Sequence, residues 1–320
     1  MGYLPLLLSF LISNAFHSLV ALLWLKGIQK LSGPIAPISR ANLSTLALIL
    51  PLAVSIEQFL GPPASSNDFV LVRLPLWIRT LMDKPALLLG VWALFAGTVA
   101  VFLIQEVRPL FRAFKRKHIS AIQSQQLEQW VDRIIGLYHQ AGLKLQRPKV
   151  CLIETNDPVA MIFGIVRPVL LISRKLLESC SRQEADVIIA HEIAHLYFGG
   201  NLRMLCIWAV RAIQAANPIS LILFRDITDL MEMACDDLAA TLTGDRKVLA
   251  QAIQKMSETN TAVSGTLLKR ARQELLQRAE EESTSYRIRV LEHTSHEGAL
   301  PSHILWLCAV ALGGMLWVIV

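Results

Sequence analysis

Four long runs of apolar residues constrain the fold of this chain more than any other feature of its sequence. A membrane-spanning helix needs about 20 predominantly apolar residues. Three runs meet this length with at most one charged residue each, and the fourth is shorter but is preceded by further uncharged residues. The runs are Leu4–Leu25, Leu43–Leu60, Ala86–Ile104 and Ile304–Val320. Only 18% of all residues are charged, against about 25% in soluble domains. The sequence therefore predicts an α-helical membrane protein with four spans.

The orientation of these spans follows from the lysines and arginines in the loops, because such residues gather on the cytoplasmic side. Residues 26–40 carry three of them and no acid, and residues 108–117 carry five. The loop between the second and third runs has mixed charge. We therefore expect residues 1–105 to form three transmembrane helices, residues 106–302 a cytoplasmic domain, and residues 303–320 a fourth transmembrane helix. The protein would lie in the inner or plasma membrane with both termini outside.

Polar residues inside the runs, Asn14, His17 and Glu57, could mark a functional site, but bonding between helices explains them more simply. The five cysteines are scattered without a CxxC pair. We therefore expect a reducing compartment and no disulfide framework.

The predicted cytoplasmic domain has the pattern of an α+β fold. Residues 119–141 have helical periodicity, and three short apolar segments indicate strands of a small sheet. These segments are Val150–Ile153, Ala160–Phe163 and Val169–Ser173. A capping box, Ser181 to Glu184, begins the next helix, and Gly199-Gly200 ends it.

This helix carries the motif HExxH as His191, Glu192 and His195. Histidines four residues apart project from one helix face, so that two ring nitrogens can bind one zinc ion. Glu192 can reach a water on the metal and take its proton as a general base. The alternative is a surface helix with two solvated histidines. Apolar flanks such as Ile189 and Ile193 argue against it, because buried imidazoles need partners.

A catalytic zinc ion needs a third protein ligand and one open position. Six residues after His195, where a metzincin has its third histidine, the chain has Asn201. Glu232 is the better candidate, and Asp236, four residues later on the same helix face, could orient a ligand histidine. The alternative is a solvated acidic face, which the apolar neighbours of Glu232 disfavour.

The segment Met204–Phe224 could be a fifth span, but then His191 and Glu232 would lie on opposite sides of the bilayer. We therefore expect it to pack against the domain or lie along the membrane surface.

These features together resemble the BlaR/MecR-type membrane zinc metallopeptidases. The resemblance rests on three spans before the domain and one after it, on HExxH, and on a further glutamate and aspartate 37 and 41 residues after the second histidine. Asn217-Pro218 and the helix into Glu232-Met233-Ala234-Cys235-Asp236 look like the NP…ELACD stretch of that family. Asp157-Pro158 through Pro168-Val169-Leu170-Leu171 is similar to the region before its catalytic helix.

The resemblance implies a gluzincin-like (zincin-like) domain with Zn2+, which cleaves cytoplasmic proteins, including repressors, in signalling. It also implies that Val169, Leu170, Leu171, Ile172 and Ser173 form the edge strand that pairs with the substrate. Tyr286–Arg289 looks like the basic element of the family, and an exposed amphipathic helix end explains this segment equally well. The chain ends at Val320 without the penicillin-binding domain of the antibiotic-sensing members. We therefore expect a different sensor, such as a separate regulatory protein. A homodimer is possible, and direct binding of nucleic acid is not expected.

Two other functions fit part of the pattern. One is an HtpX-type quality-control protease, although that family arranges its spans differently. The other is a signalling module without enzymatic activity, whose zinc site is structural. Structural zinc sites usually have four protein ligands, whereas three ligands and a base are visible here.

Overall fold

The computed structural model describes residues 3–32, 35–60, 83–107, 121–122, 124–155, 158–259, 282–291 and 299–319. The chain divides into two compact units. The helical unit comprises Met1–Arg116, Cys206–Met231 and Glu297–Val320. The mixed unit comprises Lys117–Leu205 and Glu232–His296. The segment Cys206–Met231, which lies inside the predicted domain 106–302, thus groups with the helical unit.

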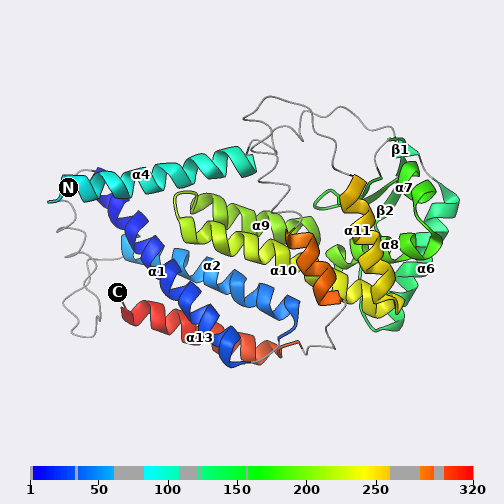
Figure 1. Ribbon diagram of the computed structural model, residues 1–320. Coiled ribbons are helices and arrows are strands. Elements are labelled where there is room, and N and C mark those ends of the chain that lie inside the picture. Colours follow the sequence, from blue (N-terminus) through cyan, green and yellow to red (C-terminus); the bar gives the residue numbers. More distant parts are fainter. Residues whose placement is uncertain are drawn as a thin grey trace. The chain divides into compact units, whose positions relative to one another are not determined.

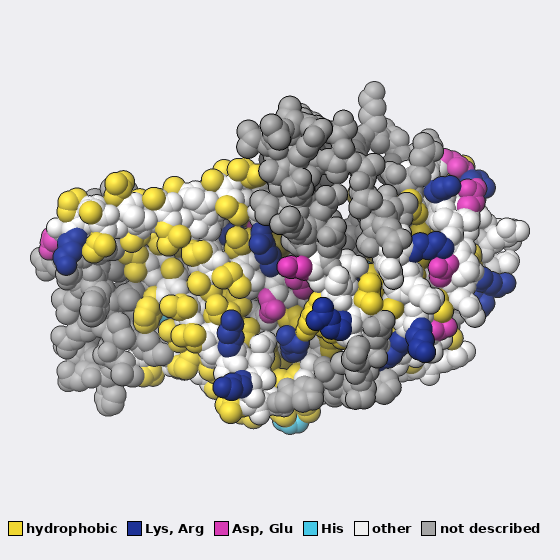
Figure 2. All heavy atoms as spheres, in the orientation of Figure 1, with side chains coloured by type: hydrophobic (Ala, Val, Ile, Leu, Met, Phe, Trp, Pro, Cys, Tyr) yellow, Lys and Arg dark blue, Asp and Glu magenta, His cyan; other side chains and the backbone are white. Residues whose placement is uncertain are grey.

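The apolar runs form the long helices of the helical unit. Its helices are α1 (Tyr3–Leu31), α2 (Pro37–Leu60), α4 (Pro85–Phe102), which continues into the π-helical turn η1 (Leu103–Val107), and α13 (Ser302–Ile319) (Figure 1). Hydrophobic side chains gather on the surface over α1, α4 and α13 (Figure 2). Among the described residues, three helical segments are long and apolar enough to cross a membrane: Leu7–Leu31, Pro37–Glu57 and Pro85–Val107. The apolar helix Ser302–Val318 is shorter, so the fourth span stays a prediction.

The segment Met204–Phe224, for which we considered a fifth span, forms parts of two helices joined by a turn. They are α9 (Gly200–Ile213) and α10 (Pro218–Thr243). At the turn, Asn217 Nδ2 donates to Asn14 Oδ1 at 2.7 Å and to Ser18 Oγ at 2.8 Å. Gln214 Nε2 donates to the carbonyl oxygen of Leu48 at 3.0 Å. The turn therefore packs against α1 and α2, which supply the hydrogen bonds that buried amides need.

Asn14 thus has a partner outside α1, at the turn between α9 and α10. His17 Nδ1 lies 2.7 Å from the carbonyl oxygen of Ser13 within α1, and the backbone of Leu316 on α13 also interacts with this histidine. Glu57 is exposed near the end of α2.

One face of α9 is fixed against the end of α4. Arg211 is fully buried, with its Nε 3.5 Å from Glu106 Oε1. Its guanidinium lies 5.1 Å from the centroid of the Phe102 ring, on which Trp208 stacks. A buried arginine that is paired in this way fixes which face of α9 points inward.

The mixed unit contains a four-stranded sheet in the order β1-β2-β4-β3. The strands are β1 (Ala121–Ile122), β2 (Lys149–Ile153), β3 (Ala160–Phe163) and β4 (Val169–Ser173). Strand β4 pairs parallel with β2 and antiparallel with β3. The three predicted strands are confirmed, within one residue at each end.

The prediction that Val169, Leu170, Leu171, Ile172 and Ser173 form an edge strand is wrong. This segment is β4, and it has a hydrogen-bonded neighbour on both sides. Leu170 and Ile172 are completely buried, as expected for an interior strand. In the described part of the sheet, β3 is the edge strand next to β4.

The HExxH helix lies in the core of the mixed unit. This helix is α8 (Arg182–Tyr197), and it contacts α6 (Gln125–Gln140), α11 (Arg246–Thr259) and β3. Four of its residues are fully buried: Ile189, Ala190, Ile193 and Ala194. The hydroxyl of Tyr138 on α6 donates to the carbonyl oxygen of Ala190 at 2.6 Å. The core thus leaves α8 little freedom to rotate, which holds the histidines in place.

Candidate metal centre

Local signals define both ends of α8. At its start, Ser181 Oγ accepts from the backbone N–H of Glu184, and the Glu184 carboxylate accepts from the N–H of Ser181. This is the predicted capping box. At its end, Gly199 and Gly200 have φ angles of +101° and +54°, which glycine adopts most easily. The motif therefore lies within one regular helix.

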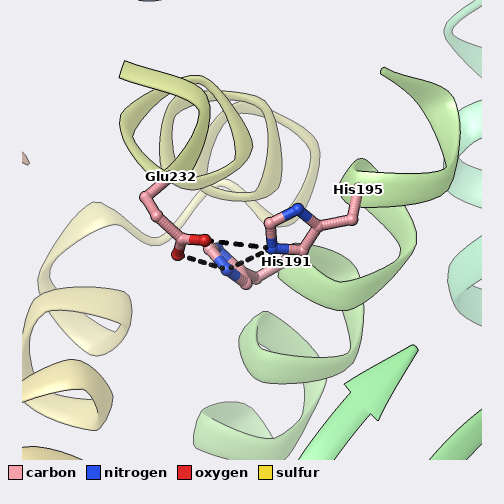
Figure 3. A group of neighbouring side chains, drawn as sticks. All are labelled: His191, His195 and Glu232. Carbon is pink, nitrogen blue, oxygen red and sulfur yellow. Dashed lines mark hydrogen bonds and ion pairs between the residues drawn. The ribbon is translucent and has the colours of Figure 1, made fainter. Parts of the chain in front are cut away.

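His191, His195 and Glu232 come together although 37 residues separate the second histidine from the glutamate (Figure 3). The Nε2 atoms of the two histidines lie 3.2 Å apart. Glu232 Oε2 lies 3.5 Å from Nε2 of His191, and its Oε1 lies 3.6 Å from Nε2 of His195. The two nitrogens and the carboxylate thus surround one point.

This donor set fits a zinc ion in both chemistry and spacing. Two histidines and one glutamate are the ligands of several catalytic zinc sites. With metal–ligand distances of about 2.0–2.2 Å, tetrahedral ligands lie about 3.3–3.6 Å apart. The two nitrogens are 3.2 Å apart, the nearest carboxylate oxygen to each lies at 3.5 or 3.6 Å, and one ligand atom from each residue lies within 4.8 Å of the others. The side chains of His195 and Glu232 remain 26% and 38% exposed. One side of the site is therefore open to solvent, as a catalytic metal requires.

The Nδ1 atom of each histidine, on the side of the ring away from the candidate metal position, also has a partner. His191 Nδ1 lies 2.9 Å from Asp236 Oδ1, and His195 Nδ1 lies 3.4 Å from Cys235 Sγ. Such partners fix the orientation and tautomer of a metal-binding imidazole. Both partners come from α10, one helical turn after Glu232. Asp236 thus lies where the sequence predicted it.

Arg287 is a residue of this site whose position the sequence analysis did not predict. It lies in the helical segment 282–291, inside the predicted basic element. Its Nε and Nη2 donate to the two oxygens of Asp236 at 2.7 and 2.8 Å. Its Nη1 lies 3.3 Å from Glu232 Oε2. One guanidinium therefore holds both the carboxylate behind His191 and the candidate metal ligand.

Substituting Arg287 is expected to weaken zinc binding. Arg287→Met removes both contacts, so zinc affinity should fall about 10- to 100-fold, the usual effect of losing an outer partner of a metal ligand. Arg287→Lys should restore only part of the loss, because an ammonium cannot donate to two carboxylate oxygens in the same planar geometry. A competition titration with a zinc chelator measures the effect. Arg174→Met, at an exposed ion pair with Glu154, is the control, and an equal loss there would contradict the prediction.

Without metal, the charges of the site favour a proton on His191. Burial opposes this proton, but Asp236 and Glu232 outweigh burial and raise the pKa of His191 to about 10. Burial also opposes the charge of Glu232, but the contacts with His191 lower its pKa to about 2. Burial and the charge of His191 lower the pKa of His195 to about 4. Burial raises the pKa of Glu192 to about 7. In the metal-free protein, an imidazolium would thus lie between two carboxylates.

Zinc binding at pH 8 should therefore release at least one proton per ion, since a metal-bound imidazole must be neutral. The proton comes from His191, because His195 and Glu232 are already deprotonated at this pH. Because folding raises the pKa of His191, protonated His191 stabilises the metal-free fold. This stabilisation is complete below pH 6.5 and is lost as the pH rises through about 10. Zinc affinity should accordingly increase with pH over that window. Calorimetry in buffers of different ionisation enthalpy counts the protons, and an absence of proton release would contradict the prediction.

Glu192 lies between the candidate metal site and the edge strand. The backbone of Ile162, on β3, hydrogen-bonds to its carboxylate. Asn201 Nδ2 donates to the carbonyl oxygens of Ile162 and Gly164 at 3.1 and 3.0 Å. Asn201 stands at the position where a metzincin would have its third histidine. In the structure it joins the first turn of α9 to the end of β3. The candidate base and strand β3 therefore meet at Ile162.

Comparison with known proteins identifies the family. A family model described as BlaR1 peptidase M56 matches residues 23–281. Two curated relatives are similar over shorter stretches. The protease HtpX homolog of Janthinobacterium sp. (strain Marseille) is 28% identical over 119 residues, which cover 36% of this chain and 39% of that protein. Protease HtpX of Enterobacter sp. (strain 638) is 34% identical over 87 residues, which cover 26% and 29%. The chain thus matches well under half of each relative.

Among solved structures, the crystal structure of S. mikatae Ste24p is similar, with 15% identity and a TM-score of 0.33 over 69% of this chain and 58% of that one. The family model covers most of the sequence, including the second and third candidate spans completely, the first from residue 23 onward, and the whole HExxH region. The membrane metallopeptidase resemblance found in the sequence is therefore confirmed, and this chain belongs to the BlaR1 peptidase family, M56.

Proposed function

We propose that this protein is a membrane zinc endopeptidase, with zinc bound by His191, His195 and Glu232 and with Glu192 as the general base. The observation that carries the proposal is the convergence of two Nε2 atoms and one carboxylate at the spacing of tetrahedral zinc ligands. When bound, the ion would activate a water molecule and polarise the peptide carbonyl of the substrate.

The residues of the chain have separate tasks in this proposal. Glu192 accepts the proton of the attacking water and passes it to the leaving amine. Asp236 and Cys235 hold the two imidazoles with their Nε2 atoms toward the ion. Arg287 holds Asp236 and Glu232 in place and offsets part of their negative charge.

The outer edge of β3 would bind the substrate as an added strand. A substrate in extended conformation can pair with an open strand edge through its backbone. Strand β3 has β4 on one side, and the backbone of Ile162 contacts the carboxylate of Glu192. A peptide paired along Ala160–Phe163 would therefore lie close to the base. It would have to take over the backbone groups of Ile162 that Glu192 and Asn201 bond in the structure. This edge replaces the strand Val169–Ser173 in the substrate-binding role.

The membrane topology and the biological role belong to the same proposal. Residues 106–302 would carry the site on the cytoplasmic side, and α13 would be the fourth span. Cytoplasmic proteins, including repressors, would be cleaved in response to a signal detected by a separate protein or by the membrane helices. A quality-control role is the second candidate, because the two curated relatives are named protease HtpX.

Metal analysis combined with N-terminal proteomics tests the proposal. Purified wild-type protein should contain about one zinc ion per chain, and 1,10-phenanthroline should abolish cleavage of casein until zinc is restored. Cells with wild-type protein should contain new protein N-termini that are absent with Glu192→Gln. A few sites in regulatory proteins would favour signalling, and many sites in damaged membrane proteins would favour quality control. Zinc binding with identical N-termini in both strains would instead favour a structural zinc site and refute the peptidase assignment.

A further inference from the structure

Exposed apolar side chains of the mixed unit are concentrated in two segments. Among its described residues, nine large hydrophobic side chains are exposed, and seven of them lie in residues 161–166 or 197–205. The first segment contributes Met161, Phe163, Ile165 and Val166, and the second contributes Tyr197, Leu202 and Leu205. Val166, at the tip of the hairpin between β3 and β4, is 87% exposed. Exposed apolar groups gathered in this way usually mark an interaction surface.

The two segments are joined into one surface, which we call the hairpin surface (residues 161–167 and 197–205). Asn201 connects them through its bonds to the carbonyl oxygens of Ile162 and Gly164. Gly164 has a φ angle of +93°, and a Cβ atom there would lie 2.8 Å from the carbonyl oxygen of Arg167. Only glycine fits this turn without a shift of the backbone. The tip is therefore held in a defined conformation next to the start of α9.

Exposed apolar residues also recur along the helix α9 itself. The exposed residues on this helix are Leu202, Leu205, Cys206, Ala209 and Ile213, which recur every three or four positions and so form one stripe. Ile207 and Arg211 are buried on another face. A helix on a water-exposed surface would carry polar residues along such a stripe. Because the helical unit contains the candidate spans, lipid is the natural partner of the stripe.

The charges near the hairpin surface match a membrane with anionic head groups. Residues 158–177 and 193–225 contain no aspartate or glutamate. Arg167, beside Val166 at the tip, is exposed. Basic residues next to apolar side chains are typical of segments that lie in the interface of an anionic bilayer.

We propose that the hairpin surface docks on the bilayer, with Ile165 and Val166 inserted between the lipid head groups and Arg167 beside anionic phosphates. The docked hairpin holds the outer edge of β3 at the membrane surface. A second consequence rests on the proposed peptidase function: the preferred substrates are polypeptides anchored in or bound to the membrane, cleaved in extended segments close to the lipid.

Spin labelling tests the docking without any assay of activity. The full chain, with Cys180, Cys206 and Cys308 changed to serine, would be labelled at Val166→Cys and reconstituted in vesicles of phosphatidylcholine and phosphatidylglycerol. Gln140→Cys, at an exposed position on α6, is the matched control. The label at residue 166 should collide more with oxygen, which dissolves in lipid, than with a water-soluble nickel chelate. The label at residue 140 should show the reverse.

Three results of the spin-label experiment would contradict the proposal. Equal, water-like accessibility at both positions would overturn the docking proposal. Protection of residue 166 from the nickel chelate only after casein is added would also overturn it, because the surface would then bind substrate instead of lipid. Arg167→Glu should reduce the immersion of the label in the anionic vesicles but not in pure phosphatidylcholine. An equal effect in both would refute the contact with anionic head groups.

Cleavage of one casein-derived reporter, used free or with a lipid anchor, tests the substrate class. Val166→Asp should lower kcat/KM for the anchored reporter about tenfold, as expected for the loss of one buried valine side chain. The free reporter should be unaffected, and equal losses would refute the preference for membrane-bound substrates. If wild-type protein cleaves neither reporter, the peptidase proposal fails, while the spin-label result still decides the docking.

Discussion

Glu192→Gln is expected to lower peptide cleavage about 10²- to 10⁴-fold, the contribution of a positioned general base, while zinc stays bound. Glutamine has nearly the same shape as glutamate, but it cannot accept the proton of the attacking water. The side chain of Glu192 is no part of the converging set of His191, His195 and Glu232, so the metal should remain. Steady-state cleavage of casein and zinc analysis of the same sample measure the two quantities.

The matched control for this substitution is Glu178→Gln. Glu178 is exposed at the end of α7 (Arg174–Ser179) in the same unit, and its loss should leave cleavage unchanged. Wild-type cleavage by the Glu192→Gln protein would exclude Glu192 as the base. Loss of zinc from that protein would mean that Glu192 supports metal binding, and the kinetic effect could not then be assigned to proton transfer.

Glu232→Ala should remove zinc from the purified protein and abolish cleavage. Losing an outer partner of a metal ligand costs about 10- to 100-fold in affinity, so the loss of a direct ligand should cost more than about 100-fold. The two remaining nitrogens, 3.2 Å apart, could still hold zinc weakly. A zinc titration with a competing chelator should therefore show weak binding, and excess zinc should not restore cleavage.

Asp237→Asn is the control on the same helix. Asp237 follows Asp236 in the chain, but it forms an ion pair with Arg246 at 2.5 Å. It takes part in none of the contacts described for the metal centre. This variant should bind zinc as the wild type does. If Glu232→Ala protein bound one zinc ion per chain as tightly as the wild type, a different residue would complete the site. The proposed ligand set would then be wrong.

The parts of the site that follow from local sequence could be predicted. The capping box at Ser181 and the spacing of His191 and His195 are properties of one helix, and a helix has a single regular geometry. Asp236 could be placed with Glu232 for the same reason, because four residues form about one turn. Pairing α8 with α10 needed an additional argument, namely that a catalytic zinc ion requires a third protein ligand.

The contacts of Arg287 could not be derived from spacing. This residue lies 51 positions after Asp236, and no helical or strand period relates the two. The basic element Tyr286–Arg289 drew attention to the segment, but an exposed helix end explained the same residues equally well. Only the tertiary fold decides which arginine of the segment reaches the carboxylates.

The error about the edge strand has a physical explanation. Strand β4 pairs in parallel with β2, and the sequence of one strand does not identify a pairing partner that is distant in the chain. The sequence did contain a relevant signal. Val169–Ile172 is an unbroken apolar run, which is typical of a strand buried on both faces. In β3, intermediate and exposed residues alternate instead, with Met161 and Phe163 exposed, as expected at an edge.

The shortness of β3 affects how fast products can leave. A four-residue strand offers an added peptide only a few backbone hydrogen bonds, each with a net contribution of about 0.5–1.5 kcal/mol. Cleavage divides even these bonds between two fragments, so neither fragment would be held tightly. Turnover would then be limited by the rate at which an extended segment arrives, and a chain that stays folded would escape cleavage.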